Sequence, residues 1–274
     1  MRTDPPKHLS ALNTLIRNAA SNTGEIEQRY RTVMALVIVG QMLPEGAVKG
    51  GSAMALRYGR KARFTRDLDV ARLSDIEDFR RKFEESLSQG WEGFTGRLIE
   101  QDPPQPPGIP TGYVMQPFEV KLSYHGKAWC TVSFELGHNE MDDALDPEAK
   151  ISDELTQLFT AVRLPEPAPV AVMRLEHQIA QKLHSASAPG SDRARDLVDL
   201  QLMINRETID FKSLKLTCDR LFRYRQAQPW PPLISKNQDW QDLYESACED
   251  MDVLKTVDEA VEWANKLIQE IDQT

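Results

Sequence analysis

Apolar residues recur every three or four positions over much of this chain, which is the period of an amphipathic helix. The pattern predicts helices over residues 9–19, 25–43 and 75–88. From Ser152 onward the spacing is almost entirely helical and is interrupted only where prolines cluster. The chain therefore changes from mixed α/β character to helical character near residue 150.

Two other segments alternate apolar and polar residues with period two, which is typical of strands. They are Phe118–Tyr124 and Ala128–Leu136, and the residues His125-Gly126-Lys127 between them predict a hairpin turn. Shorter apolar runs predict two further strands, at Ala47–Lys49 and Leu68–Leu73. The first half of the chain is thus expected to contain a small mixed sheet.

The proline-rich segment 102–110 cannot be a helix interior or a central strand, and we expect a loop there. Together the patterns predict an α+β, bilobed fold. Residues 1–150 would form a lobe with a small mixed sheet flanked by helices, and residues 151–274 a C-terminal helical lobe.

Composition narrows the function classes. The 274 residues include 33 Lys and Arg against 42 Asp and Glu, a net charge of -9, which excludes a uniformly basic nucleic-acid-binding surface. No apolar run is long enough to span a membrane, and the first residues lack the apolar core of a signal peptide. We expect a cytoplasmic protein without membrane contact. The three cysteines have no zinc-site spacing.

Two acids, Asp67 and Asp69, flank Leu68 in a predicted strand. Residues i and i+2 of a strand point to the same face. Carboxylates within about 5 Å of each other would repel by about 3 kcal/mol at an effective dielectric constant near 20. A bound Mg²⁺ or Mn²⁺ ion would relieve that repulsion and suit phosphoryl or nucleotidyl transfer. The alternative is a solvent-facing strand with two unrelated acids.

The preceding turn, Gly50-Gly51-Ser52, is suited to phosphate. Glycines allow close approach of the backbone, and a helix N-terminus favours anions. We expect Ser52 to cap a short helix that Gly59 ends. The turn lacks the spacing of a Walker A loop.

A local excess of positive charge follows this turn. Six cations and no acid occur from residue 49 to residue 66: Lys49, Arg57, Arg60, Lys61, Arg63 and Arg66. This sign reversal in an acidic chain favours a polyanion-facing surface, although a solvated basic helix end is the alternative.

A two-metal site would need a third acid, and two strand glutamates are candidates. They are Glu119 and Glu135, each with apolar neighbours, and we prefer Glu135. Either glutamate could instead lie on the solvent-exposed face of a sheet.

Two charges lie on apolar helix faces in the second half of the chain. On a wheel of about 100° per residue, Lys182 borders the apolar stripe of the predicted helix 170–185. Asp196 falls within the stripe of the predicted helix 192–205. They could form a buried structural ion pair. Alternatively, Lys182 binds a triphosphate and Asp196 orients it or the attacking hydroxyl.

These motifs together resemble a known family. Lys49-Gly50-Gly51-Ser52, Arg57-Tyr58 and Arg63-Phe64-Thr65-Arg66-Asp67-Leu68-Asp69 are similar to the first motif of the AbiEii/AbiGii abortive-infection nucleotidyltransferase toxins, in the polymerase-β-like superfamily. The helix lysine Lys182 and the segment Arg193-Ala194-Arg195-Asp196-Leu197-Val198-Asp199-Leu200 resemble a second signature.

The resemblance implies roles for individual residues. Asp67 and Asp69 would hold the metal, with Glu135 as our candidate for the third ligand. Lys182 and Asp196 would act in the active site. The implied nucleotide-binding residues are Gly50, Gly51, Ser52, Arg57, Arg66 and Lys182.

The resemblance also implies a function. It is a toxin of a toxin–antitoxin system that transfers a nucleotide from an NTP to an RNA acceptor, with the tRNA 3' end favoured, and that has a cognate antitoxin protein encoded nearby. Two alternatives stay open. One is a nucleotidyltransferase acting on a small molecule such as an antibiotic, and the other is a noncatalytic nucleotide-binding interaction module.

Overall fold

The computed structural model describes residues 4–104, 114–249 and 251–274. The chain divides into two compact units, one of residues 1–60 and 64–173 and the other of residues 61–63 and 174–274. The boundary therefore falls between Met173 and Arg174 and not near residue 150. Most of the predicted proline-rich loop, residues 105–110, lies outside the described residues.

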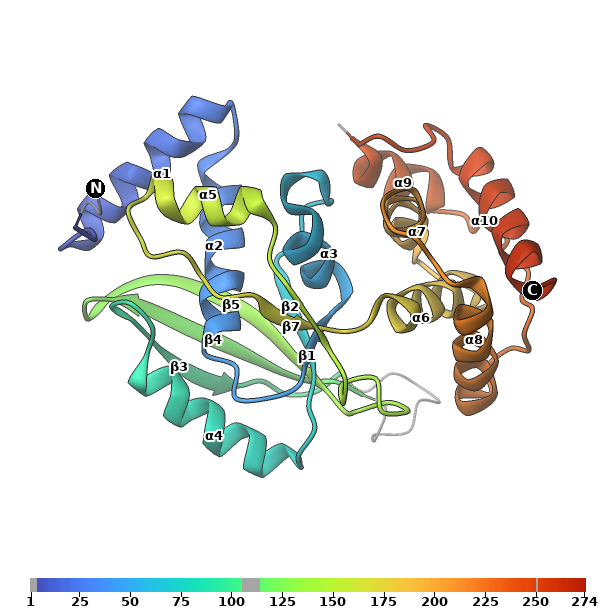
Figure 1. Cartoon of the computed structure of the whole chain (residues 1–274), viewed down its shortest axis with the longest axis horizontal. Helices are drawn as coiled ribbons and strands as arrows, with labels where there is room; N and C mark the ends of the chain where they lie inside the picture. The colour runs from blue at the N-terminus through green and yellow to red at the C-terminus, as the bar shows by residue number, and fades with distance from the viewer. Residues whose placement is uncertain (1–3, 105–113, 250) are drawn as a thin grey trace. The chain divides into compact units, whose positions relative to one another are not determined.

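The first unit contains a seven-stranded mixed sheet in its described residues, with strand order β3-β4-β5-β2-β1-β7-β6 (Figure 1). β1 pairs in parallel with β7, β2 pairs in parallel with β5, and the other neighbours are antiparallel. The strands are β1 Ala47–Lys49, β2 Asp67–Ala71, β3 Phe94–Glu100, β4 Gln116–Tyr124, β5 Lys127–Gly137, β6 Glu148–Lys150 and β7 Val170–Val172.

The predicted α+β fold with a mixed sheet is confirmed, as is the β4–β5 hairpin. Three strands were not predicted, and β6, at Glu148–Lys150, is one of them. Strand β3 lies at the sheet edge, and β7 occupies residues that the helical pattern assigned to the start of a helix. Val172 of β7 pairs with Val48 of β1, so this segment completes the sheet of the first unit. That pairing explains why the unit boundary comes after residue 150.

Helices α2 and α4 lie beside the sheet (Figure 1). Asp75 caps α4, since its side chain accepts hydrogen bonds from the backbone N–H groups of Glu77 and Asp78. The helices of this unit are α1 Leu9–Thr23, α2 Glu27–Gln41, α3 Gly50–Tyr58, α4 Ile76–Gln89 and α5 Asp153–Ala161, with a 3-10 turn at Gly59–Lys61.

One face of the sheet forms the core of this unit. Phe79 and Phe83 of α4 pack on Phe134 of β5, with ring centroids 6.3 and 5.1 Å from that of Phe134. Gly40 of α2 lies against the side chain of Val170 on β7. Because alternate strand residues point to opposite faces, the polar residues between these apolar ones lie on the other face.

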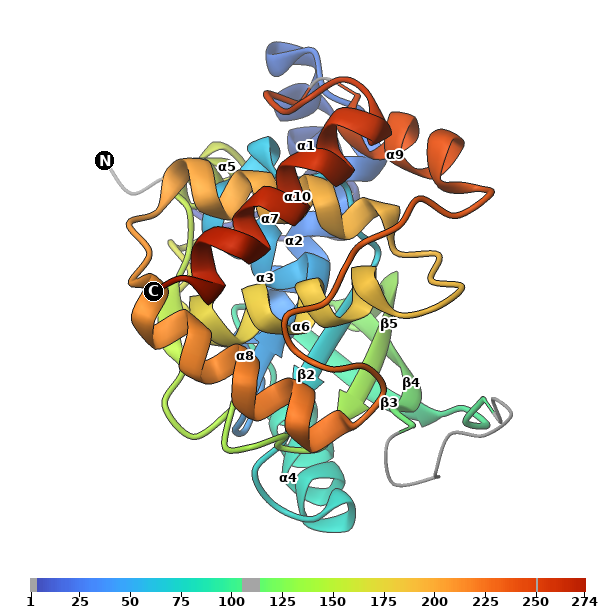
Figure 2. The same ribbon diagram turned by 90° about the vertical axis from the view of Figure 1, so that its right-hand side faces the viewer.

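The second unit is helical apart from its connections, and Figure 2 shows several of its helices. Trp240 and Tyr244 are fully buried in its core. The Tyr244 hydroxyl donates to the carbonyl of Leu254 and accepts from Gln201. The helices are α6 Leu175–Ser187, α7 Ala194–Arg206, α8 Phe211–Arg225, α9 Trp240–Cys248 and α10 Val257–Asp272.

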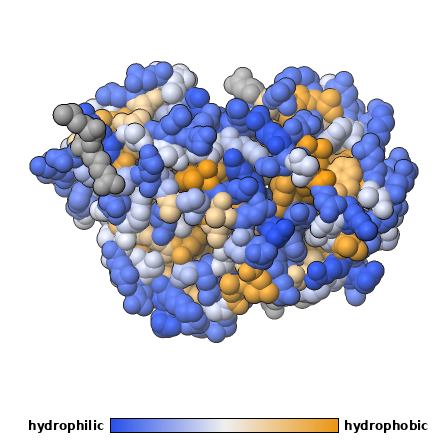
Figure 3. Space-filling view, in the orientation of Figure 1, coloured by the Kyte–Doolittle hydropathy of each residue, from blue (hydrophilic) through white to orange (hydrophobic). Residues whose placement is uncertain are grey.

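The face of the protein in Figure 3 is mostly hydrophilic, and its hydrophobic residues form several separate patches. Among the described residues, no helix combines the length and apolar character that crossing a membrane requires.

Candidate active site

Asp67 and Asp69 share one face of β2, as the sequence predicts. Leu68 between them is fully buried on the opposite face, whereas Asp67 is exposed and Asp69 partly buried. The two carboxylates therefore point away from the core of the first unit.

Glu135 joins these two acids through the strand register. Asp69 pairs directly with Glu135 on the neighbouring parallel strand β5. Directly paired residues point to the same face of a sheet and lie on strands about 4.8 Å apart. Glu119 is on β4, two strands from Asp67, and forms an ion pair with Lys121 at 3.4 Å. The register thus favours Glu135 over Glu119 as the third acid of this face.

We call Asp67, Asp69 and Glu135 the carboxylate face. In the described residues, no three His, Cys, Asp or Glu side chains are gathered closely enough to hold a metal ion. A metal site made by the three carboxylates stays a prediction, based on their oxygen chemistry and their shared face.

The glycine turn lies directly beside this face. Gly50 has φ +64°, and a Cβ atom added to it would lie 2.1 Å from Oδ2 of Asp69. The left-handed φ and the close carboxylate both require glycine. The turn and the acids, 19 residues apart in the chain, are therefore neighbours in space.

Ser52 does not cap the helix, contrary to the sequence prediction. Helix α3 begins at Gly50, two residues before Ser52. Lys49 occupies the N-cap position, and its side chain forms no capping hydrogen bond. Ser52 is 1% exposed, and its hydroxyl donates to the carbonyl oxygen of Asp67. Any phosphate contact from Ser52 would therefore use its backbone N–H, which is among the first four of the helix and lacks an intrahelical acceptor.

Of the two arginines predicted to bind nucleotide, Arg57 has a buried side chain and Arg66 is exposed. The side chain of Arg57 is 1% exposed, forms an ion pair with Glu148 at 2.8 Å and donates to the carbonyl of Met173. These contacts tie α3 to the edge of the sheet and do not support nucleotide binding by Arg57. Arg66 is exposed, and its guanidinium lies 5.6 Å from the ring centroid of Phe64.

The structure brings Lys182 and Asp196 together in the second unit, at 2.7 Å, as the ion-pair alternative predicts. The ammonium group also lies 2.7 Å from Asp199, a residue whose role the sequence reasoning missed. Helix α6 begins at Leu175 and not near residue 170, yet Lys182 still faces inward. Its predicted contact with a triphosphate stays a prediction.

Asp199 is the centre of this network. It is fully buried, and both of its carboxylate oxygens also accept hydrogen bonds from Nε of Arg63, at 3.1 Å. Asp196 and Asp199 are three residues apart on α7, so they share one helix face. That spacing was the signal in the sequence. The partner Arg63, which is 136 residues away, could not be read from it.

The charges in this network shift each other's pKa. Burial opposes ionisation of Asp199, but the neighbouring Lys182 and Arg63 outweigh it and lower the pKa of its carboxyl group. Burial also opposes the positive charge on Lys182. The neighbouring carboxylates of Asp196 and Asp199 outweigh this effect of burial, so the pKa of Lys182 is raised. Asp199 and Lys182 are therefore both charged at neutral pH.

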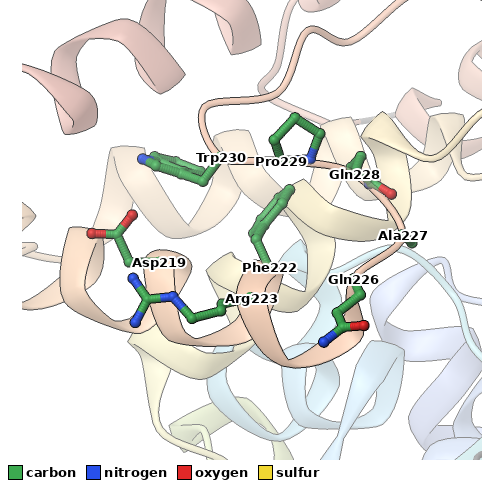
Figure 4. Close-up of a pocket in the computed structure, with 8 residues that line it drawn as sticks. All are labelled: Asp219, Phe222, Arg223, Gln226, Ala227, Gln228, Pro229 and Trp230. Atoms are coloured by element: carbon green, nitrogen blue, oxygen red, sulfur yellow. The ribbon is translucent and has the colours of Figure 1, made fainter.

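A cavity of about 500 Å³ lies elsewhere in the second unit, between α8 and the segment after it (Figure 4). Phe222 and Trp230 line it, with ring centroids 5.2 Å apart, together with the charged residues Asp219 and Arg223. None of the predicted site residues contributes to this cavity.

The comparisons with known proteins agree with the motifs. A family model described as "Nucleotidyl transferase AbiEii toxin, Type IV TA system" matches residues 41–265, which include the glycine turn, all three acids and the Lys182 network. The chain belongs to this AbiEii family. Its family is that of the nucleotidyltransferase toxins of toxin–antitoxin systems.

Two solved structures are similar to this AbiEii chain. MenT4, a nucleotidyltransferase toxin from Mycobacterium tuberculosis, is 16% identical with a TM-score of 0.48, covering 94% of this chain and 97% of that chain. JHP933 from Helicobacter pylori is 15% identical with a TM-score of 0.42, covering 88% and 89%. No curated protein matches the chain.

Proposed function

We propose that the protein is a metal-dependent nucleotidyltransferase that transfers a nucleotide from an NTP to an RNA acceptor, and we favour the 3' end of tRNA. The observation that carries the proposal is the carboxylate face beside the glycine turn. Asp69 is in register with Glu135 and lies against Gly50, so acids and helix-start amides are side by side.

The donor set suits a hard divalent cation. Asp67, Asp69 and Glu135 would hold Mg²⁺ or Mn²⁺, because carboxylate oxygens are the ligands these ions prefer. A metal bound there would supply positive charge to the triphosphate. The backbone N–H groups at the start of α3 would bind phosphate oxygens from the neighbouring side.

In the proposed reaction a hydroxyl group of the acceptor attacks the α-phosphorus of the NTP. A bond forms between the hydroxyl oxygen and that phosphorus, the bond from the α-phosphorus to the bridging oxygen breaks, and pyrophosphate leaves with that oxygen. The hydroxyl proton passes to water. The turn and the carboxylate face position the triphosphate, and positioning supplies much of the rate.

The basic segment before β2 supports an RNA acceptor. Arg57 and Arg63 are engaged in ion pairs, whereas Lys61 and Arg66 are exposed. Exposed cations bind a phosphate backbone with a steep salt dependence. We expect RNA affinity to fall as salt rises, and a small-molecule acceptor would show little such slope.

The decisive experiment incubates the protein with each labelled NTP, total tRNA and Mg²⁺, and looks for labelled RNA. Asp67→Asn, Asp69→Asn and Glu135→Gln should each abolish or strongly reduce labelling. Glu119→Gln is the matched control, since it removes an acid from the same face two strands away, and it should retain labelling.

Other outcomes would change specific parts of the proposal. Wild-type labelling that survives Asp67→Asn and Asp69→Asn would refute the metal assignment. Label on a small molecule but not on RNA would refute the acceptor class. NTP binding without any transfer would favour the noncatalytic module.

Family membership also supports a partner. We infer a cognate antitoxin protein, encoded nearby, that relieves the toxicity of this chain. Growth arrest on expression, and its relief when the neighbouring gene is co-expressed, would test that inference.

A further inference from the structure

Lys49 is the last residue of β1 and lies in the same row as two acids of the carboxylate face. It pairs with Asp69 across the β1–β2 ladder, and Asp69 pairs with Glu135 across the β2–β5 ladder. Directly paired residues share a face, so the Lys49 side chain lies on the side of the sheet that carries the carboxylates.

The Lys49 side chain extends across this face. A Cβ atom added to Gly137 of β5 would lie 2.9 Å from Nζ of Lys49 and 3.6 Å from its Cε. β2 separates β1 from β5, so the Lys49 side chain crosses the strand that carries Asp69 to reach Gly137. Gly137 has no left-handed φ that would require glycine. Its missing side chain instead leaves room for the end of Lys49.

Lys49 also differs from Lys182 in its contacts. Lys182 is held by two carboxylates at 2.7 Å. Lys49 is partly buried, and its ammonium group forms no hydrogen bond or ion pair with the part of the chain that the structure describes. An ammonium group that no described residue holds can form charge-assisted hydrogen bonds with an anionic ligand.

We propose that Lys49 binds the triphosphate of the incoming NTP. This rests on the proposed function. The ammonium group lies on the face of the sheet that would carry the metal. In the sequence, Lys49 directly precedes the turn whose backbone amides favour phosphate. A triphosphate bound there would therefore contact both Lys49 and the amides. The assignment gives the first unit its own phosphate-binding cation.

The test measures equilibrium binding by calorimetry, with Mg²⁺ and with NTP analogues whose α,β-bridge is a methylene group and cannot be cleaved. Lys49→Met should weaken binding of the preferred analogue by about tenfold or more, as loss of a charge-assisted contact does. Binding of the matching nucleoside monophosphate should change much less, and Lys49→Arg should recover part of the loss. Lys121→Met, on the same sheet, is the control and should bind as wild type does.

A second variant perturbs Lys49 without removing its charge. Gly137→Ala places a methyl group 2.9 Å from the present position of Nζ, which is too close for contact, and its near neighbours are the flexible ends of Lys49 and Met115. We expect a smaller loss of NTP affinity, and no further loss when Gly137→Ala is added to Lys49→Met. Thermal melting of each variant checks that the fold is kept.

Two failures are distinguishable. If wild-type protein binds no NTP analogue, the proposed function fails and this assignment fails with it. If wild type binds and Lys49→Met binds equally well, only the assignment of Lys49 is refuted. Tighter Mn²⁺ binding by Lys49→Met, with unchanged NTP affinity, would instead make Lys49 an internal counter-ion of the acids and would overturn the proposal.

Discussion

Replacing Asp199 by asparagine removes one negative charge from the buried network of the second unit while keeping the side-chain volume. The carboxylate is fully buried and lies 2.7 Å from Nζ of Lys182 and 3.1 Å from Nη2 of Arg63. After the substitution, Lys182 keeps Asp196 but loses its second carboxylate, and Arg63 loses its ion pair with Asp199. The network then has one buried negative charge fewer beside the same two cations.

The size of the effect follows from these distances. At an effective dielectric constant of 20, charges 2.7 Å apart attract by about 6 kcal/mol before the cost of burial is counted. Burial offsets much of this attraction, and breaking a buried pair by removing one partner costs about 3–5 kcal/mol. With a urea dependence of about 3 kcal/mol per molar, the unfolding midpoint should fall by about 1–1.7 M.

Hydrogen exchange locates the effect. Amides of α6 and α7 should lose protection in Asp199→Asn, whereas those of β4 and β5 in the first unit should not. Asp192→Asn is the matched control, because Asp192 is exposed and its pair with Arg193 is 3.6 Å long, so we expect a change below about 0.5 kcal/mol. If Asp199→Asn is as mild as this control, the network does not stabilise the unit and the reasoning is refuted.

The pH dependence gives a second check. The pKa of Asp199 is lowered in the folded state, because Lys182 and Arg63 outweigh the effect of burial. Its contribution is therefore complete above the unfolded pKa of about 3.9 and is lost as the pH falls through the lower folded value. The stability difference between wild type and Asp199→Asn should be constant near neutral pH and should shrink below about pH 4. A difference that grows on acidification would contradict the assignment.

Three further substitutions test other parts of the structure. Gly50→Ala should destabilise the first unit and reduce transfer, because its Cβ would lie 2.1 Å from Asp69 Oδ2; unchanged melting and activity would show that the turn can adapt. Arg57→Met should cost about 1–3 kcal/mol in urea unfolding by removing the ion pair to Glu148 and the hydrogen bond to the Met173 carbonyl, yet leave the affinity of NTP analogues unchanged, and a selective loss of that affinity would restore its predicted binding role. Lys182→Met should lower stability by about 3–5 kcal/mol, and weaker NTP binding at unchanged stability would instead favour the triphosphate role.

The elements that the sequence predicted well are those fixed by local periodicity. The β4–β5 hairpin follows from period-two alternation with a glycine turn, and the shared face of Asp67 and Asp69 follows from the same period. The inward direction of Lys182 and Asp196 follows from the helical period of 3.6. Each of these depends on backbone geometry within one element.

Other features depended on which elements pair. Val170–Val172 reads as the start of a helix, but it becomes strand β7 because β1 offers it a free edge. Ser52 reads as a helix cap, but the helix begins at Gly50 and the hydroxyl binds the backbone of β2. In both cases a partner distant in sequence overrides the local preference.

The sequence by itself determined the family motifs, the carboxylate pair on one strand face and the inward charges of the helical unit, since each is a spacing within a single element. Only the tertiary structure decided that Glu135 and not Glu119 stands beside Asp69, that Arg63 completes the Lys182 network, and that Lys49 reaches across the acids. Strand register and ion-pair partners come from contacts between segments far apart in the chain. No local period encodes such contacts, because they form only when the hydrophobic core brings the elements together.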